Sequence, residues 1–314
     1  MIVLRATELG MCFGVRDALA AMTRLPAPRD VTVHGELVHN PEVLRDLERR
    51  GFRASDEVTR GVPATPAVLI TAHGISARER ARLGAAGKQL IDTTCPLVEK
   101  AHAAAHTLAA AGRRLVVLGK HGHVEVRGLV EDHRDAVVIE TEADVRALGS
   151  APLGVVCQTT LPTATAARLL AALRAANPDA DVAFVDTVCA PTRARQQALQ
   201  DLLPNVEALV VVGGRGSNNT QRLAATARAA GVPVTQVEAA AELDPDWVRR
   251  YRCIGLTAGT STLDATVDAV EARLRAIGAG PSSRTGRSGH NRSSSQAASQ
   301  PQAPASSPRP TTST

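Results

Sequence analysis

The sequence predicts an α/β fold made of three related modules, and three observations support this prediction. Short runs of β-branched residues alternate with long Ala-, Leu- and Arg-rich helical segments, as in proteins with parallel sheets. The turn Asp-Thr-x-Cys occurs twice between an apolar run and a helical segment, in "LIDTTCPLVEK" and "FVDTVCAPTR". Cys12, Cys95 and Cys189 each open a helical segment, and they follow one another at similar intervals along the chain.

The predicted strands follow one another along the chain, and each is a short apolar run rich in valine and isoleucine. They cover residues 31–34, 67–71, 115–119, 136–140, 154–158, 182–185, 208–214, 232–237 and 253–259. Helices follow most of these strands, and the clearest are at 96–112 and 192–203. Ligands in such folds bind beyond the carboxyl ends of the strands, so we expect functional residues there.

The repeated cysteine turns divide the chain into modules that each supply one cysteine. We expect these α/β modules at residues 1–94, 95–187 and 188–278. Repeats of this length are too long for a solenoid, so we expect the three modules to pack together compactly. Residues 279–314 are rich in Ser, Gln, Pro and Thr and have almost no large apolar side chain, so we expect a disordered tail.

Charge gives little support for a nucleic-acid partner. The formal net charge is +5, but the arginines after residue 280 have no acidic residue among them, so the predicted folded part is nearly neutral. No apolar run reaches the length of a membrane-spanning helix. The first residues also lack the long apolar core of a signal peptide. We therefore expect a cytoplasmic protein without nucleic-acid or membrane partners.

The five cysteines are sparse and odd in number, which argues against a disulfide framework. A helix N-terminus lowers the pKa of a thiol and favours thiolate, the form that binds metals. One cysteine so placed is often only structural, but Cys12, Cys95 and Cys189 share the placement. Zinc sites usually have closely spaced cysteine pairs, which are absent here, so we favour an iron–sulfur cluster with one iron open to substrate. Cys157 and Cys253 lie within apolar strands and are expected in the core.

Polar residues follow the ends of several predicted strands, and together they could form an anion site. Hydroxyl and amide side chains, glycines and helix N-termini can surround a phosphate, and protonated histidines add positive charge. Each residue can instead be an ordinary helix N-cap, so both interpretations stay open. The candidates are His39, Asn40, His73, Ser76, His121, His123, Thr159, Thr160, Ser217, Asn218, Asn219, Thr220, Thr260, Ser261 and Thr262.

His123 and Glu125 lie two residues apart in the turn "GKHGHVEVRG". The simplest interpretation is a pair of opposite charges on the surface. The alternative is delivery of a proton to a substrate oxygen, which an imidazole or a carboxyl group performs when it lies close to the reacting atom.

The order of these motifs resembles the LytB/IspH family of 4-hydroxy-3-methylbut-2-enyl diphosphate reductases over about residues 4–275. The shared motifs are "GMCFGV", "VHGELVHNPEV", "TAHGIS", "DTTCPLVEKAH", "GKHGHVEVRG", "QTTLP", "DTVCAPTRARQQA", "GSNNTQRL" and "TAGTST". The resemblance implies a trefoil-like arrangement of the three α/β modules around a central 4Fe–4S cluster. It also implies an iron–sulfur oxidoreductase for the last step of the non-mevalonate isoprenoid pathway. That step is the reductive dehydroxylation of (E)-4-hydroxy-3-methylbut-2-enyl diphosphate to isopentenyl and dimethylallyl diphosphate.

The resemblance assigns roles by position. Cys12, Cys95 and Cys189 match the cluster ligands, which leave one iron open for the substrate hydroxyl. Glu125 matches the proton donor, with His123 beside it, and Thr159 matches the hydroxyl that orients the substrate alcohol. The residues that match the diphosphate site, or lie within it, are His39, His73, His123, Ser217, Asn218, Asn219 and Ser261. An external electron donor such as ferredoxin or flavodoxin is also implied.

Two positions depart from the family pattern. Asn218 stands where a second serine is usual, and Leu263 stands where a proline is usual near the start of the last helix. Asn218 can still donate a hydrogen bond, but it is bulkier than serine. Two alternatives therefore stay open: a diverged paralogue that acts on another phosphorylated allylic alcohol, and a non-catalytic iron–sulfur redox sensor.

Overall fold

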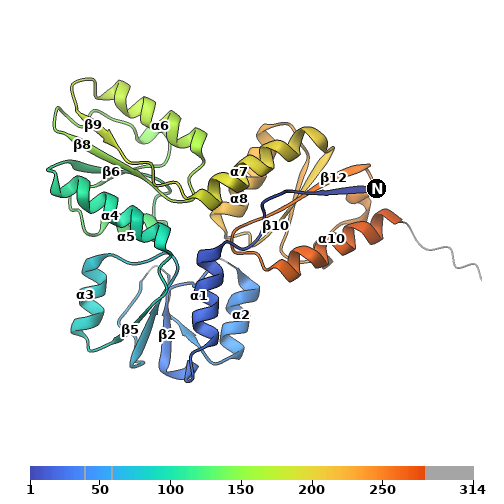
Figure 1. Ribbon diagram of the computed structural model, residues 1–314, viewed down its shortest axis with the longest axis horizontal. Coiled ribbons are helices and arrows are strands. Elements are labelled where there is room, and N and C mark those ends of the chain that lie inside the picture. The colour runs from blue at the N-terminus through green and yellow to red at the C-terminus, as the bar shows by residue number, and fades with distance from the viewer. Residues whose placement is uncertain (39, 58, 280–314) are drawn as a thin grey trace, which may run out of the picture. The chain divides into compact units, whose positions relative to one another are not determined.

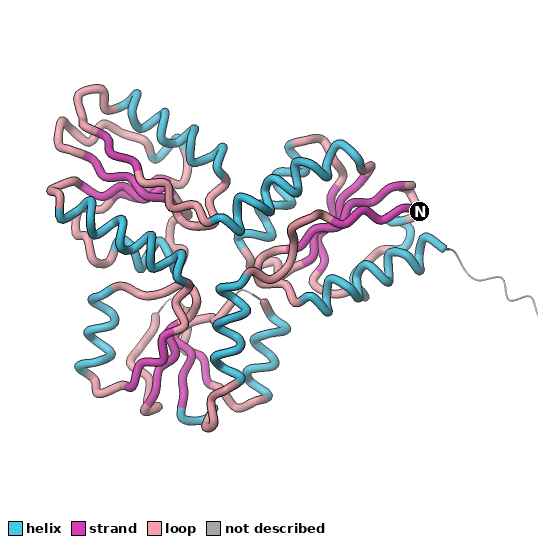
Figure 2. The backbone as a smooth tube through the Cα atoms, viewed as in Figure 1, coloured by secondary structure: helices cyan, strands magenta, loops and turns pink. Residues whose placement is uncertain are grey.

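Three four-stranded sheets, each with helices on both faces, make up the described part of the chain (Figure 1, Figure 2). The computed structural model describes residues 1–38, 40–57 and 59–279. Every strand pair is parallel. The predicted α/β fold of three parallel-sheet modules is therefore confirmed.

Each sheet contains two inner strands and two edge strands. The first sheet has the order β3-β2-β4-β5, the second β7-β6-β8-β9, and the third β1-β12-β10-β11. The strands are β1 (Ile2–Arg5), β2 (Val31–His34), β3 (Arg53–Ala54), β4 (Ala67–Ile70), β5 (Gln89–Asp92), β6 (Arg114–Leu118), β7 (Val137–Ile139), β8 (Leu153–Cys157), β9 (Val182–Phe184), β10 (Ala208–Val212), β11 (Val234–Val237) and β12 (Cys253–Ala258). Almost every residue of the inner strands is buried, because helices cover both faces of a parallel sheet.

Helices connect the strands and cover the sheets (Figure 1). They are α1 (Phe13–Thr23), α2 (Pro41–Arg49), α3 (Ala77–Ala85), α4 (Pro96–Ala110), α5 (Val124–Val130), α6 (Thr163–Ala176), α7 (Ala190–Leu202), α8 (Asn218–Ala229), α9 (Pro245–Val248) and α10 (Asp264–Ala279). Every predicted strand occurs, with bounds within two residues of those expected. No helix among residues 1–38, 40–57 and 59–279 is long and apolar enough to cross a membrane.

Strand β1 does not pair with the sheet that follows it in the sequence. It pairs with β12 in the third sheet, where Val3 lies opposite Ile254, whereas residues 1–94 were expected to form one module. Val3 is buried there beside side chains of α10, such as Leu274. Helix α1 then crosses to the first sheet, where Met22 packs against Val33. The expected module boundary is corrected accordingly, because burial of β1 beside β12 decides its partner.

Each sheet has its own apolar core, built mainly from valine and leucine. On β8, Val155 and Cys157 face one side with Leu169 of α6, and Val156 faces the other side with Leu108 of α4. The burial predicted for Cys157 is therefore confirmed. Cys253 differs from the prediction, because it begins β12 at a half-buried position and its thiol donates to the Asn205 oxygen at 3.3 Å.

Candidate active site

Three cysteines stand at the N-termini of three helices. Cys12, Cys95 and Cys189 are the N-cap residues of α1, α4 and α7, and their backbones are extended. None of their side chains caps its helix, and all three are free, half-buried thiols. The shared placement therefore leaves each sulfur available for another role.

The turns that carry these thiols approach one another closely. A Cβ at Gly14, in the first turn of α1, would lie 2.6 Å from the Cys95 sulfur, so only glycine fits at this position. The Cys12 N–H donates to the Thr260 oxygen at 3.1 Å, and the Cys189 N–H donates to the Thr159 oxygen at 2.9 Å. These two bonds fix the turns of Cys12 and Cys189 against strand ends that carry predicted site residues.

This set of donors fits an iron–sulfur cluster. Cysteine thiolates are the usual ligands of such clusters, and three helix ends here present thiols that have no structural role as caps. Among the described residues, no group of three or more His, Cys, Asp and Glu side chains is arranged to hold a single metal ion. A cluster is larger than one ion, so thiols on three separate helix ends suit a cluster better.

The prediction that helix N-termini lower the pKa of these thiols is wrong for Cys95 and Cys189. Burial raises the pKa of Cys95 and outweighs the backbone N–H groups of Leu97 and Val98, which lower it. Burial also raises the pKa of Cys189, against the opposing effect of hydrogen bonds with Thr192. A thiolate loses hydration when it is buried, and a helix end replaces that hydration only in part. Iron binding would therefore be coupled to loss of the thiol protons.

Glu125 is a buried carboxyl that receives hydrogen bonds from one residue. It is 2% exposed and lies in the first turn of the short helix α5. Its Oε1 accepts from the Thr159 N–H at 2.6 Å, and its Oε2 accepts from the Thr159 hydroxyl at 3.0 Å. Burial raises the pKa of Glu125 to about 7, although Thr159 and the charge of Arg222 oppose the rise. A carboxyl in this state can hold and deliver a proton near neutral pH.

His123 is the N-cap of α5, two residues before Glu125. Its Nδ1 accepts from the Glu125 N–H at 3.2 Å, so a neutral His123 ring carries its proton on Nε2. The ring meets His73, from the loop after β4, edge to face with 5.7 Å between ring centroids. The two histidines therefore come together from the first and second modules.

A small cavity of ≈ 50 Å³ brings together residues that follow strands of all three sheets. It is lined by Val15, Val38, His73, His123, Glu125, Thr160, Ser217, Asn218, Asn219, Thr260 and Ser261. Most of the predicted substrate residues therefore share one cavity, and Thr159 is bonded to Glu125 beside it. His39 lies outside the described residues.

The turn that begins α8 supplies three of the lining residues. Ser217 is the N-cap of α8, and its hydroxyl accepts from the Thr220 N–H at 3.4 Å. The Asn219 Oδ1 accepts from the Thr260 N–H at 3.3 Å. Asn218 Nδ2 is buried and has no hydrogen-bond partner among the residues that the structure describes. Ser217 is thus both a helix cap and a lining residue, so the two interpretations of the polar turns are compatible.

Other predicted polar residues act elsewhere. Asn40 caps α2, and its Nδ2 donates to the Ser261 oxygen at 2.6 Å, which joins the first and third modules. Ser76 caps α3 and His121 is paired with Asp144 at 3.5 Å, and neither residue lines the cavity. These polar residues at strand ends have structural roles.

Arg222 is a residue of the site that the sequence analysis did not single out. Its Nη1 donates to the Thr160 oxygen at 2.6 Å, and its charge lowers the pKa of Glu125 against the larger effect of burial. It lies on α8 four residues after Asn218, on the same helix face. A basic residue at that spacing, inside the motif "GSNNTQRL", was the available signal.

Comparison with known proteins identifies the family. A family model described as LytB protein matches residues 3–275. This chain belongs to the LytB family. The family is iron–sulfur dependent, in agreement with the thiols at three helix ends.

Relatives of this LytB chain align over nearly their whole length. A protein of Azoarcus sp. (strain BH72) is 37% identical, over 88% of this chain and 90% of the relative. A protein of Bordetella pertussis is 37% identical, over 88% of this chain and 87% of the relative. Both are named 4-hydroxy-3-methylbut-2-enyl diphosphate reductase.

Solved structures have the same fold as this LytB chain. The E-1-hydroxy-2-methyl-but-2-enyl-4-diphosphate reductase of Plasmodium falciparum has a TM-score of 0.79 and 27% identity, over 85% of this chain and 86% of that chain. A structure of (E)-4-hydroxy-3-methyl-but-2-enyl diphosphate reductase, described as the terminal enzyme of the non-mevalonate pathway, has a TM-score of 0.62 and 28% identity. It covers 88% of this chain and 100% of that chain.

Proposed function

We propose that this chain reduces (E)-4-hydroxy-3-methylbut-2-enyl diphosphate to isopentenyl and dimethylallyl diphosphate, the last step of the non-mevalonate pathway. Family membership and the names of relatives over almost the full chain support this function. The observation that carries it is the buried Glu125 carboxyl beside this cavity, because burial raises its pKa to about 7. An iron–sulfur oxidoreductase that removes a hydroxyl group needs such an acid.

The reaction breaks the bond between carbon and the hydroxyl oxygen and replaces it with a bond between carbon and hydrogen. Two electrons and two protons enter, and one molecule of water leaves. A 4Fe–4S cluster bound by Cys12, Cys95 and Cys189, with one iron free of protein ligands, would pass electrons from an external donor to the substrate and polarise the substrate oxygen.

Glu125 is the residue that we assign to protonation of the leaving oxygen. The proton makes the departing group water, which leaves more readily than hydroxide. Thr159 donates to Glu125 through its N–H and its hydroxyl, and so fixes the direction in which the carboxyl faces. The same hydroxyl is assigned to orient the substrate alcohol. The fixed donor geometry reduces the rearrangement that the reaction requires.

The diphosphate is assigned to the polar side chains that line the cavity. The α8 turn contributes Ser217 and Asn219, with Asn218 between them, and Ser261 follows β12. His73 and His123 add hydrogen-bond donors, and His39 is predicted to do the same. The start of α8 also favours an anion through its free N–H groups. Binding of the diphosphate thus positions the carbon skeleton near Glu125.

An anaerobic assay with a reduced viologen dye and the proposed substrate tests this function. Protein purified without oxygen is expected to be brown and to form both diphosphate products. Absence of product from protein that has an intact cluster would overturn the proposal.

Asn218 favours one alternative substrate class. Asn218 lines the cavity, and its buried Nδ2 has no partner among the described residues, so a substrate with an additional acceptor oxygen could bind there. Under this alternative, Asn218→Ser lowers turnover of another phosphorylated allylic alcohol more than it lowers turnover of the proposed substrate. Rescue by this chain of a strain that lacks the isoprenoid reductase would exclude the alternative.

The electron donor and the compartment stay predictions. We expect a protein such as ferredoxin or flavodoxin to supply the electrons, and a location in the cytoplasm. The alternative of a redox sensor without turnover predicts no product in the viologen assay, together with binding of a partner that depends on the cluster.

A further inference from the structure

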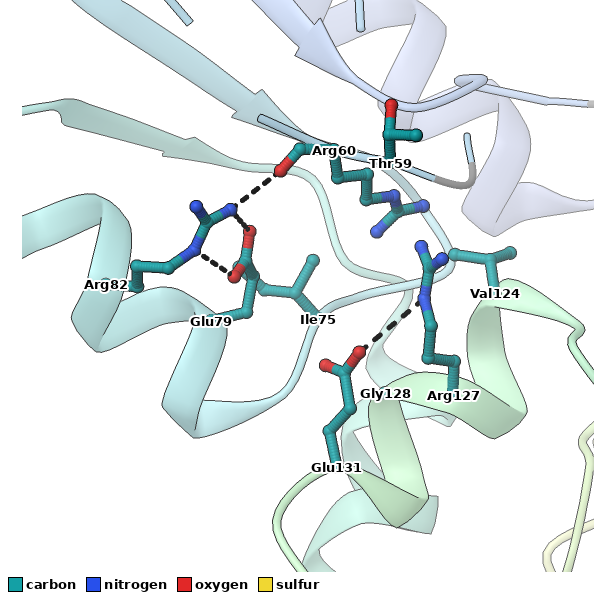
Figure 3. A pocket seen from close by; sticks show the side chains of 9 residues that line it. All are labelled: Thr59, Arg60, Ile75, Glu79, Arg82, Val124, Arg127, Gly128 and Glu131. Atoms are coloured by element: carbon teal, nitrogen blue, oxygen red, sulfur yellow. Dashed lines mark hydrogen bonds and ion pairs between the residues drawn. The ribbon is translucent and has the colours of Figure 1, made fainter. Parts of the chain in front are cut away.

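A second polar cavity lies between the first and second modules, and Figure 3 shows the side chains that line it. We call the contact region formed by residues 57, 59, 60, 75–82 and 124–132 the seam. Its cavity has a volume of ≈ 160 Å³ and is lined by Thr59, Arg60, Ile75, Glu79, Arg82, Val124, Arg127, Gly128 and Glu131. The seam is therefore lined mainly by charged groups.

The seam and the proposed substrate cavity share two chain segments. His73 lines the substrate cavity, and Ile75, two residues later in the same loop, lines the seam cavity. On α5, His123 and Glu125 line the substrate cavity, whereas Val124 between them lines the seam cavity. A shift in the seam would therefore move residues of the substrate cavity.

The N-terminus of α3 is capped by a residue from the other module. Asp132, which follows α5, accepts from the Ala77 N–H at 2.7 Å and from the Arg78 N–H at 3.0 Å. These two N–H groups belong to the first turn of α3 and have no partner within the helix. A carboxylate is also a favourable group at the positive end of a helix.

Glu131 adds a third bond between the same two segments. The Ser76 hydroxyl donates to Glu131 Oε2 at 2.8 Å, while its oxygen accepts from the Glu79 N–H at 3.0 Å. Ser76 lies three residues after His73. Glu131 and Asp132 thus hold the end of the loop that presents His73.

Arg127 fixes α5 from the other side of the seam. Its Nη2 donates to the Glu57 backbone oxygen at 2.9 Å, and its Nε is paired with Glu131 at 3.7 Å (Figure 3). Gly128 lies at this contact, where a Cβ would lie 3.6 Å from the backbone carbon of Ile75, an ordinary van der Waals distance. Directed bonds to side chains therefore help to set the spacing of these segments.

We propose that Asp132 and Glu131 are positioning residues that hold His73 against His123 and so shape the diphosphate site. All three hydrogen bonds connect the segment that follows His73 to the end of the helix whose start carries His123. The proposal rests on the proposed function, because that function places the diphosphate beside these histidines.

Binding of inorganic pyrophosphate to the anaerobically prepared holoenzyme, measured by calorimetry, tests the proposal without turnover. Asp132→Ala is expected to weaken binding about tenfold, the equivalent of one hydrogen bond to a charged ligand. In a His73→Asn background the same substitution is expected to have little further effect, because its action passes through His73.

Asp144→Ala is the matched control. Asp144 lies in the same module and also accepts from two backbone N–H groups, those of Glu140 at 3.0 Å and Thr141 at 2.8 Å, but it lies outside the seam. Asp144→Ala is expected to leave pyrophosphate binding unchanged. Asp132→Asn keeps the shape of the side chain and one acceptor oxygen, so it serves if Asp132→Ala does not fold, with weakening of a few-fold expected.

Three results would overturn the proposal. They are equal binding by the wild type and the Asp132 variants, additive effects of Asp132→Ala and His73→Asn, and absence of pyrophosphate binding by the wild type. A wild type that binds pyrophosphate with the expected variant pattern but forms no product would instead overturn the proposed reductase function alone.

Discussion

Glu125 in the substrate cavity is buried, and Glu79 in the seam is half-buried. The pKa values of these two carboxyls shift in opposite directions. The effect of burial alone is to raise the pKa of both groups, and hydrogen-bond donors and nearby charges oppose this effect. At Glu125 the opposing donors are the neutral N–H and hydroxyl of Thr159, and the pKa rises to about 7. At Glu79 the hydrogen bonds and charge of Arg82, together with His34, outweigh burial and lower the pKa.

This comparison shows how one residue type has two roles in neighbouring cavities. Arg82 donates twice to Glu79, at 2.6 Å from Nε and 2.6 Å from Nη2, so this carboxylate stays ionised and its bonds lie within the first module (Figure 3). The charge of the Arg222 guanidinium lowers the pKa of Glu125, but this guanidinium donates its hydrogen bond to the Thr160 oxygen. Glu125 therefore keeps a proton that it can deliver.

The largest expected effect is the loss of the Glu125 proton. Glu125→Gln keeps the shape of the side chain but removes the acid, so turnover is expected to fall about 10²- to 10⁴-fold. Anaerobic turnover assays and iron analysis measure this, and the brown colour and iron content are expected to stay as in the wild type. Normal turnover by this variant would show that another group delivers the proton.

A smaller effect is expected when Thr159 loses its hydroxyl. Thr159→Val removes the donor to Glu125 Oε2 at 3.0 Å and is expected to lower kcat about tenfold, the value of one strong hydrogen bond. Thr159→Ser keeps the hydroxyl and is the matched control, with kcat near that of the wild type. Equal kcat values for the Val and Ser variants would contradict the role of the hydroxyl.

The pH dependence of turnover tests the electrostatic part of the comparison. The reaction needs protonated Glu125, so kcat/KM is expected to fall as pH rises through about 7. Arg222 lowers the pKa of Glu125, so Arg222→Gln is expected to move this fall to higher pH. A profile for Arg222→Gln that is unchanged, or that moves to lower pH, would contradict the assignment.

Glu79 is expected to affect stability and to leave catalysis nearly unchanged. Glu79→Gln removes a carboxylate from Arg82 and His34 and is expected to lower the free energy of unfolding by about 1–3 kcal/mol. Because the pKa of Glu79 is lowered in the folded chain, this contribution is present above the unfolded pKa and is lost as pH falls through the folded pKa. Urea unfolding at several pH values measures it. A large loss of kcat in Glu79→Gln would contradict the prediction that Glu79 contributes to stability and Glu125 to catalysis.

Local sequence patterns predict most of the fold and the chemical groups of the site. The apolar runs indicate the strands, and the repeated turns indicate three thiols at helix N-termini. The pair His123 and Glu125 is likewise visible as a short motif. These features depend on residues close together in the sequence, so the sequence alone can indicate them.

Features that depend on tertiary burial could not be predicted in this way. Strand β1 pairs with β12, which lies at the other end of the described chain. The raised pKa of Cys95 and Cys189 follows from burial between modules, against the local effect of a helix end. The cap that Asp132 provides to α3 joins different modules, and no local pattern marks it.

Infrared spectroscopy of Glu125 tests the central claim most directly. The difference spectrum between the wild-type holoenzyme and Glu125→Gln isolates the carbonyl band of the protonated carboxyl. This band is expected to be strong in mild acid and to disappear as pH rises through about 7. A band that disappears near the ordinary glutamate value of 4.5 would show that Glu125 is ionised at neutral pH and would contradict its role as the proton donor.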